Sequence, residues 1–89
     1  MNWENNTAYD CDFVNAGVSM STYYDVNIQE CLLACRNNTE CTHFVISMKD
    51  TENEIGICHL KSGEILKEDA SNRNGSVCVI VKDSYGKFN

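Results

Sequence analysis

The 89-residue sequence contains no proline, so no proline marks a domain boundary or a linker. It also has no long apolar run. The longest, "VCVIV" at 77–81, is far shorter than the roughly 20 apolar residues that a membrane-spanning helix needs. Basic residues are scarce, with 7 Lys and Arg against 13 Asp and Glu and a formal net charge of −6. These absences argue against membrane insertion, and against nucleic acid as a partner because an acidic surface repels phosphate backbones.

The few basic residues are also scattered along the chain. They are Arg36, Lys49, Lys61, Lys67, Arg73, Lys82 and Lys87. Because they form no cluster in sequence and the net charge is negative, heparin-like polyanions are disfavoured as ligands.

Cysteine, in contrast, is abundant, with six residues in this short chain. The hydrophobic core of so small a domain supplies only a few kcal/mol. An even number of cysteines at this density is therefore typical of a secreted domain held by disulfides. Sequons for N-linked glycosylation at Asn5, Asn37 and Asn74 also favour a secretory route. We expect an extracellular location or the lumen of the secretory pathway.

The first ten residues, "MNWENNTAYD", lack the basic start and the apolar stretch of a signal peptide. We therefore expect Met1 to be an added initiator, and residues 1–89 to be a single domain taken from a larger secreted protein. Its core is expected at about 9–83, with flexible ends at 1–8 and 84–89.

The pattern of apolar residues predicts one helix among about five short strands. Alternating or continuous apolar runs rich in β-branched and aromatic residues predict strands at 9–14, 18–24, 41–47, 55–61 and 77–81. The last of these is apolar throughout, so we expect it to be buried and central. The polar stretch 62–76 is expected to be a long irregular connection with a short helical turn around 64–69. The fold class is therefore α+β with an antiparallel sheet.

The helix, expected at about 28–37, has the clearest local signals. Asn27 is a favourable N-cap, and Glu30 follows three residues later, as in a capping box. The run "IQECLLACR" places apolar side chains at 28, 31, 32 and 35, which share one helical face. The asparagines of "NNTE" at 37–40 favour a turn and end the helix.

A zinc site is one alternative role for the cysteines. Its candidate ligands are Cys31, Cys35, Cys41, Cys58 and His59. Structural zinc sites favour a C-x2-C spacing, which occurs nowhere in this chain. A catalytic cysteine is a second alternative, but it needs a thiolate beside a base, and an even cysteine count leaves no odd thiol.

The histidines and the acidic stretch also have ordinary interpretations. His43 and His59 lie in predicted strands, and we interpret each as a half-buried or surface strand residue rather than a catalytic base. The stretch "DTENEIG" at 50–56 has alternating acids, but its glycine is misplaced for a calcium loop and no helices flank it. We expect a hairpin loop there, and we expect no enzymatic activity, no metal and no cofactor.

Disulfide bonds remain as a role for all six cysteines. Cys35 and Cys41 flank the turn after the helix and are close enough in sequence to bridge. Cys31, one helical turn earlier, would then reach the strand that carries Cys58, and the two remaining cysteines would pair. That nested scheme is one of the many pairings that six cysteines allow, and spacing alone does not select it.

The order and spacing of these residues resemble the PAN/Apple domain family, in its six-cysteine Apple type. The resemblance rests on "ECLLAC" followed by Cys41, on Phe44 in "CTHF", on "CHLKS" at 58–62 and on an outer cysteine pair. It covers about 9–83 and implies a twisted antiparallel sheet of about five strands cradling one helix. It also implies the bridges Cys11–Cys78, Cys31–Cys58 and Cys35–Cys41.

The resemblance further implies a function. Domains of this family are non-enzymatic and bind proteins or carbohydrates within larger secreted chains. We therefore expect an extracellular module for binding or adhesion whose partner is a protein or a glycan. The alternative is a structural spacer or self-association domain of a mosaic secreted protein. A carbohydrate site would combine aromatic faces with polar groups, and the candidate residues are Tyr23, Tyr24, His59, Lys61 and Tyr85.

Overall fold

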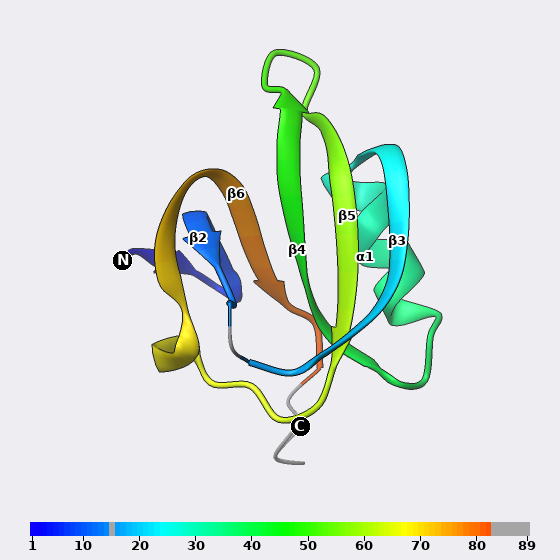
Figure 1. The fold of residues 1–89 in the computed structure, drawn as a ribbon, viewed down its shortest axis with the longest axis vertical. Helices are drawn as coiled ribbons and strands as arrows, with labels where there is room; N and C mark the ends of the chain where they lie inside the picture. The colour runs from blue at the N-terminus through cyan, green and yellow to red at the C-terminus, as the bar shows by residue number, and fades with distance from the viewer. Residues whose placement is uncertain (15, 83–89) are drawn as a thin grey trace.

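The structure is a computed structural model that describes residues 1–14 and 16–82. It contains one helix, α1 (Ile28–Arg36), packed on a six-stranded sheet (Figure 1). The strands are β1 (Trp3–Glu4), β2 (Thr7–Asp12), β3 (Val18–Asn27), β4 (Cys41–Asp50), β5 (Ile55–Ser62) and β6 (Ser71–Ile80). Their order across the sheet is β1-β2-β6-β4-β5-β3, and every neighbouring pair is antiparallel. The predicted α+β class is confirmed.

The strand that contains residues 77–80 of the run "VCVIV" is central, as predicted. β6 pairs with both β2 and β4, and its residues 76–79 are buried. The sheet has six strands rather than five, because Trp3 pairs with Ala8 to form the short β1. Residues 1–8, expected to lie outside the core, thus contribute β1 and the start of β2. Trp3 stacks on Phe13, with 6.2 Å between the ring centroids.

β6 also begins earlier than predicted, inside the stretch 62–76 that was expected to be irregular. Ser71 and Asn72 pair with Asp12 and Cys11 of β2. Their side chains are exposed, so this half of the strand has no apolar alternation and is formed by backbone pairing with β2. The predicted short helical turn is present as the 3-10 helix η1 (Lys67–Asp69).

The capping box predicted for α1 is confirmed. The Asn27 side chain accepts a hydrogen bond of 2.8 Å from the backbone N–H of Glu30, and the Glu30 side chain accepts one of 2.9 Å from the N–H of Asn27. The helix ends at Arg36, one residue before the predicted end, and Asn37 is its C-cap. Within the part of the chain that the structure describes, no helix is long and apolar enough to span a bilayer.

Each face of the sheet buries its own apolar cluster. Because side chains alternate along a strand, Phe44 and Ile46 of β4 face α1 while Val45 faces the other way. The cluster under α1 contains Phe44, Ile46, Leu60, Val77, Val79 and the cysteines of α1, β4 and β5. The cluster on the opposite face contains Ala8, Phe13, Val45, Ile65 and the cysteines of β2 and β6. The central strands are therefore covered on both faces.

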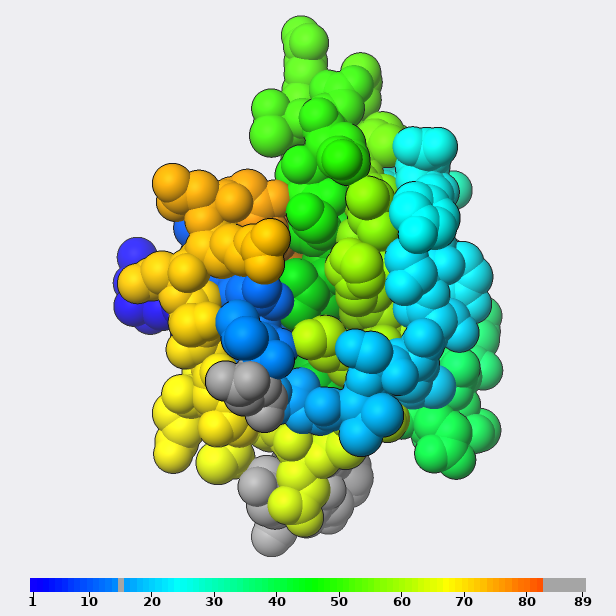
Figure 2. Space-filling model, viewed as in Figure 1, coloured from blue at the N-terminus to red at the C-terminus, as the bar shows by residue number. Residues whose placement is uncertain are grey.

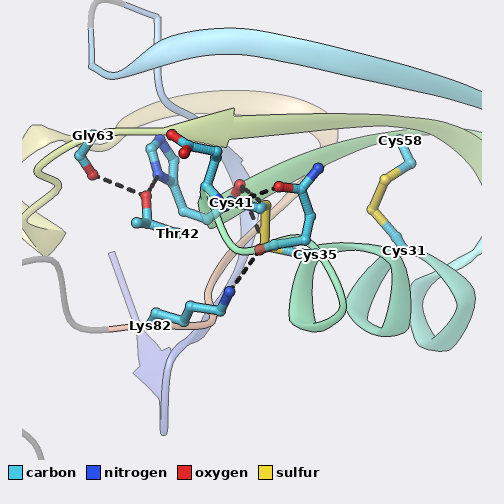
Figure 3. The surroundings of a disulfide bond; sticks show 10 residues. Cys31, Cys35, Cys41, Thr42, Cys58, Gly63 and Lys82 are labelled. Atoms are coloured by element: carbon cyan, nitrogen blue, oxygen red, sulfur yellow. Dashed lines mark hydrogen bonds between the residues drawn. A yellow bond between two sulfur atoms is a disulfide. The ribbon is translucent and has the colours of Figure 1, made fainter.

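Three disulfides tie these layers together, in the pairing that the family resemblance implies. They are Cys11–Cys78, Cys31–Cys58 and Cys35–Cys41. The first joins β2 to β6, the second joins α1 to β5, and the third closes the turn between α1 and β4. Figure 3 shows the second and third, spaced along the same side of the helix. All six half-cystines are buried, so the bridges are part of the two cores.

We expect the disulfide that closes the longer loop to contribute more to stability. Cys11–Cys78 has a sequence separation of 67 residues and Cys35–Cys41 one of only 6. In a chain-entropy treatment, the two crosslinks are worth about 4.5 and about 2 kcal/mol of unfolding free energy. All four cysteines are fully buried, so replacing either pair with alanine removes similar packing and makes the two variants a matched comparison.

Urea denaturation of the two double variants measures this difference. Cys11→Ala/Cys78→Ala should lose roughly 2 kcal/mol more unfolding free energy than Cys35→Ala/Cys41→Ala. Equal losses, or a larger loss in the second variant, would contradict the chain-entropy explanation.

Candidate functional site

A polar pocket of about 240 Å³ lies on the face of the sheet opposite α1. Five strands contribute its lining, which consists of Asp12, Ser19, Val45, Ser47, His59, Lys61, Arg73 and Ser76. Figure 2 looks onto this face, where the orange residues of β6, the green β4, the yellow-green β5 and the blue residues of β2 meet. Apart from Val45, every lining side chain is polar or charged.

The alternation of β5 determines which of its side chains reach the pocket. Cys58 is bonded to α1, and Leu60 belongs to the apolar cluster under α1. His59 and Lys61, which alternate with them, therefore point to the opposite face and line the pocket.

The register of β4 with its two neighbouring strands determines which side chains meet at the centre of the pocket. Val45 of β4 pairs with His59 of β5, and Ser47 of β4 pairs with Ser76 of β6. Residues that pair directly in antiparallel strands share a face, so both pairs lie in the same surface. The pocket floor therefore consists of neighbouring side chains from the three central strands.

An ion pair between β2 and β6 forms one wall. Arg73 Nη1 lies 2.9 Å from Asp12 Oδ2, and the side chains are 63% and 13% exposed, respectively. The carboxylate is thus inside the wall and the guanidinium at the pocket mouth. An exposed pair of this kind contributes at most about 1 kcal/mol, so its main effect is to orient the guanidinium.

Lys61 is held by the chain segment that follows β2. Its Nζ donates a hydrogen bond of 2.7 Å to the carbonyl oxygen of Phe13. An ammonium group has three N–H donors, so two remain for a ligand.

His59 is partly buried beside Lys61. Its Nδ1 lies 3.5 Å from Oγ1 of Thr22 on β3, which leaves Nε2 for a ligand. Burial lowers the pKa of His59, the nearby charge of Lys61 lowers it further, and Asp12 opposes the shift. The imidazole is therefore neutral at neutral pH, and its ring nitrogens can donate or accept a hydrogen bond.

Three serines supply further polar groups. The side chains of Ser19, Ser47 and Ser76 make no hydrogen bond to another residue in the described parts of the chain. Each hydroxyl can donate one hydrogen bond and accept others. The pocket therefore presents several hydrogen-bonding groups that residues 1–14 and 16–82 leave unused.

A buried histidine supports the segment that holds Lys61. His43 of β4 is fully buried and meets the Phe13 ring edge-on, at 5.2 Å between centroids. Its Nδ1 lies 2.8 Å from Thr42 Oγ1, and its Nε2 lies 3.5 Å from the carbonyl oxygen of Ala16. The prediction of a half-buried or surface residue is therefore wrong for His43, because the segment after β2 covers this central strand.

Gly17 allows that segment to lie so close to the ring. Its φ is 82°, and a Cβ atom there would lie 2.6 Å from His43 Cε1 and 2.6 Å from the carbonyl oxygen of Ser62. Only glycine fits both the backbone conformation and the space.

The structure gives the cysteines one role. All six are in disulfides, so the candidate zinc ligands Cys31, Cys35, Cys41 and Cys58 have no thiolate to offer. In residues 1–14 and 16–82, no group of three or more His, Cys, Asp and Glu side chains is arranged to hold a metal ion.

The five predicted ligand-binding residues are not all brought together. His59 and Lys61 line the pocket. Tyr23 and Tyr24 are exposed on β3, at 42% and 67%, and are not part of the lining. Tyr85 lies outside the described residues.

The three candidate glycosylation sites are accessible. Asn5, Asn37 and Asn74 are all exposed, as a glycosylation acceptor must be. Their modification stays a prediction.

Sequence reasoning did not identify the residues that complete the pocket. Asp12 was visible only as a polar position in an alternating strand, and Arg73 lay in a stretch expected to be irregular. The serines belong to no motif. No local signal marks these residues, because the pocket exists only once five strands are paired.

A family model described as the PAN domain matches residues 11–85, and the six cysteines in three disulfides fit the Apple-type pattern. No curated protein and no solved structure matches the chain. The family resemblance predicted from the sequence is confirmed.

We expect acid to destabilise the fold through His43. Burial lowers the pKa of this histidine from 6.5 to about 4. As pH falls from 6.5 to 4, the unfolded chain takes up a proton that the folded protein does not, so the unfolding free energy falls. The loss reaches at most roughly 3 kcal/mol. Urea denaturation at a series of pH values measures it.

His43→Gln removes the titrating group and keeps a hydrogen-bonding side chain. This variant should be less stable at pH 7 but show a flatter decline toward pH 4 than the parent protein. His59→Gln is the matched control and should flatten the decline less, because His59 is only partly buried. A decline in His43→Gln as steep as in the parent would show that other groups cause it.

Proposed function

The chain belongs to the PAN domain family, and on that premise we propose that it is a non-catalytic extracellular module that binds a protein or carbohydrate ligand. The family consists of extracellular protein- and carbohydrate-binding modules. The ligand site that we propose for this chain is the pocket lined by His59, Lys61 and Arg73. The three disulfides support an extracellular location, because such bonds persist in oxidising compartments.

The observation that carries this proposal is the convergence of unused hydrogen-bonding groups in one concave site. Binding sites typically combine a cavity with a few well-placed polar groups. Here those groups are the hydroxyls of Ser19, Ser47 and Ser76, the free ring nitrogen of His59 and the remaining donors of Lys61. The sheet and the disulfides hold these hydrogen-bonding groups in place before a ligand binds, which lowers the entropic cost of binding.

A binding role without catalysis is supported by the state of the reactive side chains. A cysteine nucleophile requires a thiolate, and every cysteine here is oxidised to a disulfide. His43 is buried, with its ring nitrogens directed at Thr42 and Ala16 rather than at the pocket.

A second candidate function is self-association through β3. This strand forms one edge of the sheet, is mostly exposed and displays Tyr23 and Tyr24. Its sequence, VSMSTYYDVN, has no Lys, Arg or Pro, the residues that commonly discourage edge-to-edge pairing. However, its pairing with β5 is interrupted twice by bulges, and bulges twist an edge away from a partner. We therefore rank it second.

We expect neutral changes in the pocket floor to weaken ligand binding. The oxidised domain is screened against arrayed glycans and extracellular proteins, with a reduced sample as control. For a ligand found in this way, His59→Ala and Ser47→Val should each reduce affinity about tenfold or more, corresponding to about 1.4 kcal/mol. Tyr24→Ala is the control on the exposed edge and should bind like the parent. No binding to any glycan or protein, or equal losses in all three variants, would contradict the proposed site.

Self-association has its own test. If β3 pairs with β3 of a second copy, sedimentation velocity should show dimers whose fraction rises with concentration, and Tyr24→Lys should abolish them. Tyr9→Lys changes a tyrosine of similar exposure on β2 and should leave dimers unaffected. A monomer at every concentration would show that the second function is wrong.

A further inference from the structure

We propose that the pocket binds an acidic saccharide, with the carboxylate of one sugar unit lying between Lys61 and Arg73. This inference rests on the proposed function and adds the chemical class of the ligand. It follows from the charge, the hydrogen-bonding groups and the size of the pocket.

The charge of the pocket is opposite to that of the protein. The chain has a net charge of −6 and only 7 basic residues, yet Lys61 and Arg73 both line this one pocket. Among the described residues that line it, Asp12 is the one carboxylate, and Arg73 already neutralises it. The lining therefore carries one positive charge that no other lining residue balances, which suits a ligand with a single negative charge.

The hydrogen-bonding groups of the pocket are mostly donors. Lys61 uses one of its three N–H groups on Phe13, and Arg73 uses Nη1 on Asp12. A guanidinium has five N–H donors in a planar fork, so several remain for the two oxygens of a carboxylate. Because donors outnumber acceptors, the complementary ligand is rich in acceptor oxygens.

The serine hydroxyls favour a sugar over a bare anion. Ser47 and Ser76 lie side by side in the floor, and Ser19 lies on β3 at another side. Hydroxyls both donate and accept, as the hydroxyls of a sugar ring do. They would contact the ring while the two cations contact its carboxylate.

The size and position of the pocket favour one sugar unit over a peptide or a polyanion. About 240 Å³ is slightly less than the roughly 300–1,000 Å³ of typical small-molecule sites. The pocket lies on a sheet face, whereas peptides commonly add to a sheet edge. A long polyanion would place its other charges against a surface whose net charge is negative, so one charged unit fits better than many.

The test is an NMR titration of the oxidised domain with D-glucuronic acid, N-acetylneuraminic acid, galactose, galactose 6-sulfate, N-acetylaspartate and a heparin fragment. Glucuronic or N-acetylneuraminic acid should shift the backbone amides of residues 59–61 and 73–76, with dissociation constants of about millimolar. Binding should weaken with added NaCl, because salt screens charges at the exposed mouth. Galactose should bind at least about tenfold more weakly, because it lacks the charged group.

Charge variants locate the effect in the pocket. Lys61→Gln and Arg73→Gln should each weaken binding of the acidic sugar about tenfold, whereas Lys61→Arg and Arg73→Lys should restore much of it. Lys49→Gln is the matched control, because Lys49 is exposed and lies outside the lining. The amide dispersion of each variant shows whether it has folded, and the two charge-conserving variants keep the test valid if a glutamine variant unfolds.

Other results would overturn the inference in distinguishable ways. Equal binding of galactose would exclude the acidic class and leave the proposed function intact. Equal binding of N-acetylaspartate would show that the pocket recognises a carboxylate without the sugar. Tighter binding of galactose 6-sulfate or the heparin fragment would show that the pocket prefers a sulfate group to a carboxylate. The absence of amide shifts with every sugar would also overturn the inference. The proposed function fails only if, in addition, the domain binds none of the arrayed proteins.

Discussion

The register of β6, β4 and β5 is the constraint on which the rest of the structure depends. A slip of one residue would exchange the two faces of a strand, because side chains alternate with a period of two. Two disulfides oppose such a slip from opposite sides of the sheet. Cys58 is fixed to α1 on one face, and Cys78 is fixed to β2 on the other. These two covalent bonds, together with the burial of apolar side chains, therefore fix which face of the sheet each side chain of the central strands occupies.

The pocket is a consequence of that assignment. Once Cys58 and Leu60 face the helix, His59 and Lys61 must face away from it, where the second apolar cluster covers only part of the sheet. The first half of β6 then closes the site, because its pairing with β2 brings Arg73 to Asp12. The same chain segments that staple the fold therefore set the positions of both cations.

The sequence was informative wherever a signal was local. Asn27 and Glu30 predicted the start of the helix, and the apolar run around Cys78 predicted a central strand. The first half of β6 was missed because its side chains are exposed, so that backbone pairing with β2 forms the strand without an apolar pattern. Of the pocket, the sequence indicated only His59 and Lys61, as residue types suited to a carbohydrate site. Arg73 could not be placed beside them, since their proximity requires the full strand order.

For the acidic saccharide that we propose as ligand, the acidic surface and the cationic pocket together favour selectivity over tight binding. At physiological ionic strength the Debye length is about 8 Å, so surface acids distant from the pocket scarcely weaken its attraction for one bound charge. They do act on further charges of a longer ligand, because those charges lie over the acidic surface itself. A net charge of −6 thus penalises polyanions while a singly charged sugar unit avoids most of the repulsion. Discrimination of this kind requires the cations to be few and fixed in position, and in this domain Lys61 is held by Phe13 and Arg73 by Asp12.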